Sequence, residues 1–462
     1  MSSFKLTRRE FLSICGLAAA GSFLTECLPP PAPTVMPGTT PYLSPTANLS
    51  NLFFTESAPT ATASPIAIDS QMVTLPQNLL TSPGKLYEDF ETVGDWRATS
   101  GRHAANTTQF QTGTQSIKIT SAMGGAGRIS KTGLSWDLTG FGRISLWLYL
   151  HNTTLSDYTA VYVYLYTDES NYYWINPNPL TRLRPGAQLL NRCQADFSSS
   201  GSPDWANITR IDIRVNANAG LTVDMSVDGL YFFRSGIPAI MFDFDDGYAS
   251  QYNIAFAKMK TYGMRGSLNL ATDRIPTYLS LDNILEIDAA GWTVVNHTNS
   301  ATVLTTLSES DQELAIRGGQ TALTGWGLTK GKNYLAYPGG KWDSNTLIAM
   351  TNTGIVMGRG TRPTVSSGDC VLPPYHILDV QSSSMDTDTS LETAKGYVDA
   401  NIARGSILPL HFHDIGSSGQ WTQADFETFV DYVYSKRTQI YVITKDDFYN
   451  LQTSEVRVPR IQ

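Results

Sequence analysis

Three carboxylates occur at the end of one short apolar run in the C-terminal half of the chain. The run covers residues 239–244, and Asp243, Asp245 and Asp246 lie within it or directly after it. Carboxylates that leave an apolar strand are costly unless a positive charge holds them. Two adjacent carboxylates can also divide the work of hydrolysis, since one can coordinate a cation while the other accepts a proton.

Histidines end two further apolar runs. Residues 292–297 end in His297, and residues 407–413 carry His411 and His413 on one face of a strand. The whole chain has only six histidines, and each one alone is explained by an ordinary core or surface position. Their joint placement with the aspartates at strand ends is what predicts a functional site.

These runs belong to a repeating pattern that begins at about residue 236. Short apolar runs alternate with amphipathic stretches of helical period, and several of these stretches end in glycine, as at Gly263, Gly291 and Gly405. The predicted strands cover residues 239–244, 265–270, 292–297, 334–337, 355–359, 407–413 and 440–444. The pattern predicts a seven-stranded α/β barrel over residues 236–462, with the polar side chains at the C-terminal strand ends, where such barrels do chemistry.

Residues 86–235 follow a period of two instead. Apolar residues alternate with Tyr162, Tyr164 and Tyr166, and the same alternation recurs elsewhere in the segment. This pattern predicts an antiparallel β-sandwich, so that the chain has more than one domain. The tyrosines either stack on sugar rings or pack against the second sheet or a neighbouring domain.

The N-terminus predicts export. Arg8 and Arg9, followed by a weakly apolar stretch, form a twin-arginine signal within residues 1–27. Cys27 ends a lipoprotein-like cleavage box, and the Pro-, Thr- and Ser-rich residues 28–85 are predicted to be a disordered linker. We therefore expect an extracytoplasmic protein, secreted or anchored as a lipoprotein, with a membrane or cell-wall tether at its N-terminus.

The charge composition of the chain indicates which class of partner it does not bind. The formal net charge is −8 and charged residues make up 16% of the chain, against about 25% in typical domains. Because phosphate neutralisation by basic residues supplies most of the affinity for nucleic acids, we expect no nucleic-acid partner.

Four motifs of the C-terminal segment resemble the polysaccharide deacetylase (NodB homology) family. They are Phe244–Gly247, His297-Thr298, Tyr337–Gly340 and Leu410–Asp414, in the order found in that family. The resemblance implies a distorted (β/α)7 barrel and the hydrolysis of N- or O-acetyl groups from a polysaccharide or oligosaccharide. Residues 88–91 and 113–119 in turn resemble galactose-binding-like jelly-roll modules, which implies a carbohydrate-binding-like sandwich.

The deacetylase resemblance also implies roles for single residues. Asp245 would be the general base and His413 the general acid. Asp246 and His297 would hold one divalent metal, zinc, and a backbone N–H near Gly339 would stabilise the oxyanion.

The chain departs from the family pattern at the metal. Ala301 stands where the family has its third metal ligand, and the family's usual arginine in the third motif is replaced. Asp243 and Asn299 are the alternative donors, and Arg359 is the alternative partner for Asp245.

Two functions therefore stay open. The first is an exported, metal-dependent carbohydrate deacetylase, and the second is a weak or inactive relative that acts as a carbohydrate-binding module. Chitin oligomers, peptidoglycan, an exopolysaccharide and acetylxylan are all compatible substrates.

The export prediction can be tested on the leader alone. Changing Arg8 and Arg9 to lysine should leave the precursor in the cytoplasm, because the paired arginines are what the twin-arginine route reads. Cell fractionation measures the outcome, and Arg317→Lys serves as the matched control outside the leader. Normal secretion of the double variant would contradict the assignment.

Overall fold

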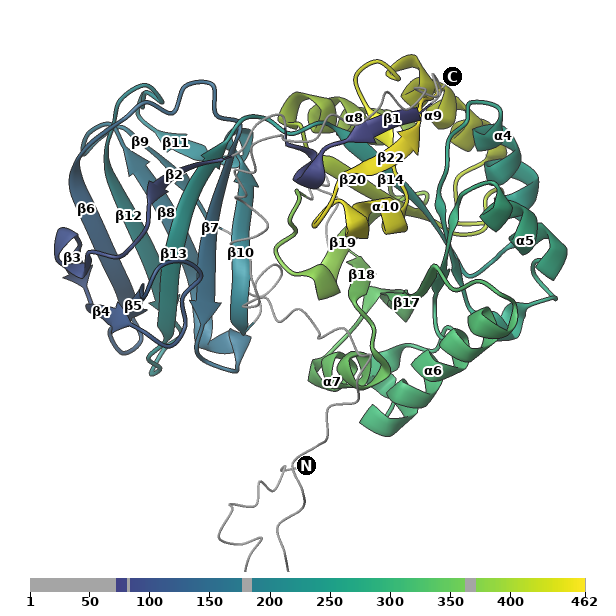
Figure 1. Cartoon of the computed structure of the whole chain (residues 1–462), viewed down its shortest axis with the longest axis horizontal. Helices are drawn as coiled ribbons and strands as arrows, with labels where there is room; N and C mark the ends of the chain where they lie inside the picture. Colours follow the sequence, from purple (N-terminus) through teal and green to yellow (C-terminus); the bar gives the residue numbers. More distant parts are fainter. Residues whose placement is uncertain (1–71, 81–83, 177–184, 362–370, 462) are drawn as a thin grey trace, which may run out of the picture. The chain divides into compact units, whose positions relative to one another are not determined.

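Eight parallel strands form the sheet of the C-terminal part of the chain (Figure 1). The structure, a computed structural model, describes residues 72–80, 84–176, 185–361 and 371–461. The predicted leader, with Arg8, Arg9 and Cys27, lies outside the described residues. None of the helices within these ranges is long and apolar enough to cross a membrane.

Seven of the strands close into a barrel. The sheet contains β14 (Ala239–Asp245), β15 (Ser267–Leu270), β16 (Thr293–Asn296), β17 (Gly331–Ala336), β18 (Met357–Thr361), β19 (Val380–Ser384), β20 (Ile407–Phe412) and β21 (Tyr441–Val442). β14 pairs with both β15 and β20, which closes the ring. β21 pairs only with the first residues of β14 and stays outside the ring.

The predicted number of barrel strands is confirmed, but the prediction of residues 440–444 as one of them is wrong, because they form β21 outside the ring and β19 completes it. Strand β19 was not predicted, because its residues Gln381–Ser384 are polar and show no apolar alternation. Ser382 and Ser383 are nevertheless buried. The Ser382 hydroxyl donates a hydrogen bond to the Gly360 carbonyl at 3.0 Å, so this buried hydroxyl has a partner inside a strand where the sequence pattern indicates a loop.

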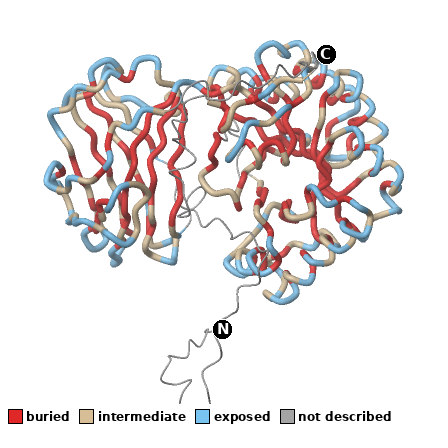
Figure 2. The backbone as a smooth tube through the Cα atoms, viewed as in Figure 1, coloured by how far each residue is buried: buried red, intermediate tan, exposed pale blue. Residues whose placement is uncertain are grey.

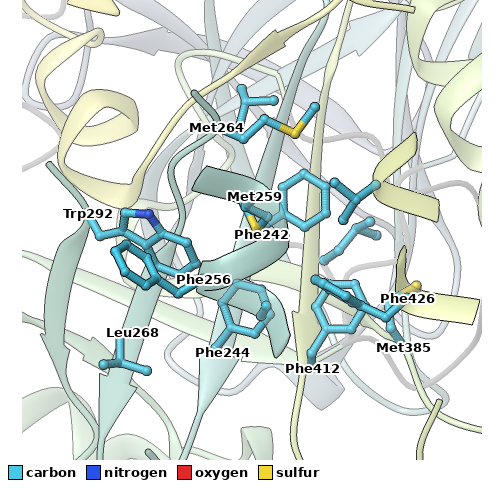
Figure 3. Close-up of a cluster of buried hydrophobic side chains, with 14 of the residues drawn as sticks. Phe242, Phe244, Phe256, Met259, Met264, Leu268, Trp292, Met385, Phe412 and Phe426 are labelled. Atoms are coloured by element: carbon cyan, nitrogen blue, oxygen red, sulfur yellow. The ribbon is translucent and has the colours of Figure 1, made fainter. Parts of the chain in front are cut away.

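Side chains of β14 alternate between the apolar core outside the barrel and the site inside it. Phe242 and Phe244 face outward and pack with Phe412, Phe426 and other apolar side chains between the barrel and its helices (Figure 3). Successive side chains of a strand point to opposite faces. Asp243 and Asp245 therefore point into the barrel.

Helices surround the barrel, and in the described residues each of them except α4 follows a residue whose side chain accepts a hydrogen bond from a helical N–H. They are α4 (Ala257–Lys260), α5 (Leu281–Ala289), α6 (Glu309–Gly325), α7 (Ser344–Thr353), α8 (Leu391–Arg404), α9 (Gln423–Ser435) and α10 (Lys445–Asn450). A π-helix, Gln251–Phe256, directly precedes α4. The side chains of Ser280, Ser308 and Ser390 accept a hydrogen bond from the third helical N–H of α5, α6 and α8. Gly405 ends α8 at φ 61°, as the glycine spacing predicts.

Two antiparallel sheets form the preceding part of the chain. The first contains β2 (Lys85–Glu88), β4 (Arg102–Asn106), β5 (Ser116–Thr120), β7 (Arg143–Leu150), β10 (Gly186–Cys193) and β13 (Asp224–Phe233). The second contains β3 (Arg97–Ser100), β6 (Ala126–Trp136), β8 (Tyr158–Tyr166), β9 (Tyr172–Ile175), β11 (Ser198–Ser200) and β12 (Ile208–Ala217). Both sheets contribute to one buried apolar cluster. In Figure 2 the buried residues, coloured red, lie along the strands.

The predicted linker extends too far toward the C-terminus. Within it, β1 (Met72–Leu75) pairs antiparallel with β22 (Val456–Pro459), near the end of the chain. Leu75 and Leu79 are buried in an apolar cluster that also contains barrel residues such as Met241. A short apolar run inside a Pro- and Thr-rich stretch thus forms a strand because the other end of the chain supplies a partner.

Candidate functional site

A strained turn presents the two adjacent carboxylates at the mouth of the barrel. Asp245 ends β14, and Asp246 follows in a left-handed conformation with φ 79°. Gly247 continues the turn at φ 85°. A positive φ is uncommon outside glycine and costs free energy, so surrounding contacts must hold it. The Asp246 amide donates to the Asn269 carbonyl at 2.9 Å, which is one such contact.

Asp245 is a buried carboxylate with one oxygen occupied and one facing a histidine. Its Oδ1 accepts hydrogen bonds from the Arg359 guanidinium and from Asn269 Nδ2, the latter at 2.7 Å. Its Oδ2 lies 3.9 Å from His413 Nε2. Burial would raise the pKa of Asp245, but neighbouring positive charge, that of Arg359 above all, outweighs it and holds that pKa well below the usual range.

A second layer of charge lies beneath Asp245. Asp243 is completely buried, with its Oδ2 3.1 Å from Lys445 Nζ and 3.7 Å from Arg359 Nε. Lys445 Nζ also donates to Asn269 Oδ1 at 2.5 Å. Burial raises the pKa of Asp243 against the opposing charges of Lys445 and Arg359, and it lowers the pKa of Lys445 to about 8.

His297 is held in one tautomer. Its Nδ1 lies 2.8 Å from the Ala336 carbonyl, which only accepts hydrogen bonds, so Nδ1 carries the proton. Its Nε2 therefore presents a lone pair, 3.6 Å from Asp246 Oδ1. Burial lowers the pKa of His297, although Asp245 and Asp246 oppose that shift.

The two histidines of β20 and its end have different surroundings. His411 is buried, and its Nδ1 lies 2.8 Å from the Ser382 hydroxyl. Burial and the Arg359 charge keep the pKa of His411 well below its usual range, so the ring is neutral. His413 has 35% of its side chain exposed and is the histidine that can reach a substrate.

The oxygen of Asp246 that faces His297 also faces a guanidinium. Arg274 Nη1 lies 2.7 Å from Asp246 Oδ1. Arg274 belongs to a short turn, Thr272–Arg274, that follows β15. It also lies over the rings of Tyr248 and Tyr278, with its guanidinium carbon 5.9 Å and 5.2 Å from their centres.

The structure brings the two predicted metal ligands, Asp246 and His297, together but adds no third donor. A zinc site of catalytic type takes three protein ligands and a water, whereas only Asp246 and His297 converge here. In the described residues no group of three or more His, Cys, Asp or Glu side chains is arranged to hold a metal ion. Arg274 also occupies the Asp246 oxygen that would contact the ion.

The alternative donors do not complete the set. A Cβ atom added to Gly318 of α6 would lie 2.9 Å from the Asn299 Cβ and 3.3 Å from its Nδ2, so Asn299 lies against that helix. Asp243 lies inside the barrel with Lys445 and Arg359 as its partners. Ala301 has no side chain that could coordinate an ion. Gly339 lies in the turn after β17, and its role at an oxyanion stays a prediction.

Sequence reasoning did not find three residues that the structure brings to this site. Asn269, Arg274 and Lys445 contact the carboxylates but belong to none of the quoted motifs. Lys445 and Arg274 do come shortly after predicted strands, at the barrel end where function concentrates. A search for charged residues after every predicted strand, and not only after the strands that end in histidine, could have identified Arg274 and Lys445.

Part of the barrel matches a known family. The model of the polysaccharide deacetylase family matches residues 234–358. This stretch contains Asp245, Asp246 and His297 and ends one residue before Arg359. The YxkH protein of Bacillus subtilis (strain 168), which bears the name of a polysaccharide deacetylase, is 26% identical over 143 residues, which are 30% of this chain and 51% of YxkH. The chain thus spans about half the length of that relative.

Two solved structures, both with low sequence identity to this chain, serve for comparison. A family 4 acetyl xylan esterase from Clostridium thermocellum, in complex with a cobalt ion, is 13% identical and covers 46% of this chain and 91% of its own, with a TM-score of 0.33. A family 11 carbohydrate-binding module from Clostridium thermocellum, in complex with a β-1,3-1,4-mixed-linked tetrasaccharide, is 15% identical. It covers 33% of this chain and 98% of its own, with a TM-score of 0.26.

The buried lysine predicts a pH dependence of stability. The pKa of Lys445 is about 8 in the folded protein and close to 10.4 in an unfolded chain. Between these values the unfolded state binds more protons, so the free energy of unfolding contributed by Lys445 rises with pH. Relative to Lys445→Met, the wild type should gain about 1.4 kcal/mol per pH unit in this window.

Urea denaturation between pH 7 and pH 10 measures this difference. Lys260→Met is the matched control, because 59% of the Lys260 side chain is exposed on α4. Its difference from the wild type should not change with pH to this extent. A constant difference between the wild type and Lys445→Met would contradict the assignment.

Proposed function

We propose that the barrel is a carbohydrate deacetylase that hydrolyses N- or O-acetyl groups of a polysaccharide. One observation carries the proposal: Asp245, in the stretch that matches polysaccharide deacetylases, has an oxygen facing the half-exposed His413 across 3.9 Å. Hydrolysis of an amide or ester needs such a base for water and an acid for the leaving group.

In this proposal Asp245 accepts the proton of the attacking water. Its depressed pKa keeps it ionised, and its Oδ1 is held by Arg359 and Asn269, so that Oδ2 is the oxygen left to react. The water oxygen bonds to the acetyl carbon. Arg359 is a positioning residue, because it acts through Asp245.

His413 completes the reaction. When the bond from the acetyl carbon to the sugar nitrogen or oxygen breaks, His413 gives its proton to that atom, which leaves as an amine or alcohol. The second product is acetate. No step of this proposal is assigned to a metal, because the donors present do not form the predicted centre.

The cellular setting is part of the same proposal. We place the enzyme outside the cytoplasm, on the strength of the twin-arginine pattern at Arg8 and Arg9 and the lipoprotein-like box at Cys27. The Pro-rich residues after Cys27 would then hold the folded part away from a membrane or wall. An extracytoplasmic polysaccharide fits that location.

A second function, carbohydrate binding, is supported by the outer face of one sheet. In β8 the valines and Leu165 point into the core, whereas Tyr162 and Tyr164 are half-buried on the opposite face. The guanidinium carbon of Arg214 lies 5.5 Å from the Tyr162 ring centre and that of Arg128 lies 5.0 Å from that of Tyr164. For Tyr162 and Tyr164, packing against the second sheet is therefore wrong, while packing against a neighbouring domain stays a prediction.

This face has the chemistry of a sugar-binding surface. Tyr162 and Tyr164 stack with ring centres 5.5 Å apart, and Trp174 of β9 lies 6.1 Å from Tyr162. Flat aromatic rings bury the apolar face of a sugar ring, and arginines beside them donate hydrogen bonds to hydroxyl groups. We propose that it binds the polysaccharide on which the barrel acts.

Acetate release tests the proposed catalysis. On a panel of acetylxylan, chitin oligomers and peptidoglycan, Asp245→Asn should lower kcat by about 10²–10⁴. His413→Asn should slow amide substrates more than esters, because an amine needs protonation to leave and an alcohol needs it less.

The matched control is His103→Asn, which removes a histidine of β4 far from the barrel strands in sequence. It should leave acetate release unchanged. Circular dichroism verifies that each variant is folded. Unchanged turnover in a folded Asp245→Asn variant would contradict the assignment of the base.

Polysaccharide binding tests the second role. Tyr164→Ala should weaken binding of a soluble polysaccharide in affinity electrophoresis by about two- to twelvefold, the equivalent of 0.5–1.5 kcal/mol for one aromatic contact. Tyr434→Ala, which removes a partly exposed tyrosine of α9, is the control. Equal retardation of the two variants would show that the face does not bind the sugar.

A further inference from the structure

A guanidinium takes the place of a metal beside Asp246 and His297. Asp246 Oδ1 lies 2.7 Å from Arg274 Nη1 and 3.6 Å from His297 Nε2, so one oxygen faces both groups. We infer that Arg274 is the resident cation of this site, and that the site excludes a divalent ion until Arg274 is removed.

The backbone fixes Arg274 relative to His297. The turn Thr272–Arg274 is joined to the segment after His297 by two hydrogen bonds. The Thr272 amide donates to the Thr298 carbonyl at 3.2 Å, and the Asp273 amide donates to the Asn299 carbonyl at 2.8 Å. Thr298 has φ 66°, so this loop holds a costly conformation that such contacts must maintain. Arg274 therefore starts from a backbone position tied to the histidine loop.

Two tyrosines hold the side chain of Arg274. Tyr248 and Tyr278 stack on each other with ring centres 4.9 Å apart and an angle of 23°. The guanidinium lies over both rings, and a cation over an aromatic face is stabilised by about 0.5–2 kcal/mol. Its side chain is 27% exposed, so the charge is held in place while it remains open to a ligand.

A metal and this guanidinium compete for the same oxygen. Zinc binds a carboxylate oxygen at about 2.0–2.2 Å, and the resulting cation would stand next to the positive charge of Arg274. Like charges at that separation repel strongly in a partly buried site. With Ala301 in the third position, only two protein donors are left to offset this repulsion.

The guanidinium also offers a donor to a reacting group. Arg274 Nη1 lies within hydrogen-bond distance of Asp246 Oδ1, and because this nitrogen carries two N–H groups, one of them is left for another acceptor. In a deacetylase, and therefore only if the proposed function holds, this N–H is suited to the carbonyl oxygen of the acetyl group, where negative charge develops.

Zinc titration decides the identity of the cation without any measurement of activity. The full chain is treated with a chelator, freed of the chelator, and titrated with zinc chloride in a calorimeter. Four proteins are compared: the wild type, Ala301→His, Arg274→Gln with Ala301→His, and Arg317→Gln with Ala301→His. We expect no zinc binding by the wild type below about 1 mM, and the Arg274→Gln double variant should bind at least about tenfold more tightly than Ala301→His alone.

The control and a second variant keep the result interpretable. Arg317 pairs with Glu313 on the surface of α6, and its side chain is 51% exposed, so Arg317→Gln should leave the zinc affinity of Ala301→His unchanged. Arg274→Met keeps the apolar stem against the tyrosine rings and replaces Arg274→Gln if circular dichroism shows that the latter is unfolded.

Two results would overturn the inference. One is micromolar zinc binding by the wild type that Asp246→Asn abolishes. The other is equal zinc affinity of Ala301→His with and without Arg274. Acetate release by the chelator-treated wild type is measured separately: its absence would count against the proposed function, whereas the titration would still identify the cation.

Discussion

Charge compensation inside the barrel is the constraint on which the site depends. Asp243 and Asp245 project from one strand into a closed ring of strands, where an unpaired charge would cost several kcal/mol. Arg359 bridges both carboxylates, Lys445 pairs with Asp243, and Asn269 donates a hydrogen bond to Asp245. Because these partners come from separate strand ends, the barrel must close before the carboxylates are paired. The ionised Asp245 is thus a product of the whole ring.

A further carboxylate, that of Asp246, needs a positive partner at the mouth of the barrel. Asp246 is turned away from the interior by its left-handed backbone, and its negative charge meets a cation that the loops supply. Burial lowers the pKa of His297 and so favours the neutral ring, and the Ala336 carbonyl fixes its proton on Nδ1. Arg274 can therefore satisfy Asp246 without a metal, while His297 keeps a lone pair toward the same point. The site thus lacks the third metal ligand at Ala301 and has a positive charge, that of Arg274, beside Asp246.

The antiparallel sheets use the same alternation for a different purpose. Valines of β8 fill the core, and Tyr162 and Tyr164 between them lie on the outer face, where Arg214 of β12 and Arg128 of β6 lie 5.5 Å and 5.0 Å from their ring centres. The barrel directs its charged residues inward and pairs them, whereas this sheet directs its polar and aromatic residues outward. One part therefore offers reacting groups and the other a surface suited to sugar rings, which fits an enzyme that acts on a polymer.

The sequence alone determined the periods, and hence six of the seven ring strands, the antiparallel strands of the preceding part and the strand ends that carry Asp245, His297 and His413. These follow from alternation within a few neighbouring residues. Only the tertiary structure decided that polar β19 is a barrel strand, that Asn299 lies against a helix, and that Arg274 and Lys445 neutralise the carboxylates. Such pairings join residues far apart in the chain, and which charges meet depends on how the strands and loops are arranged around the ring.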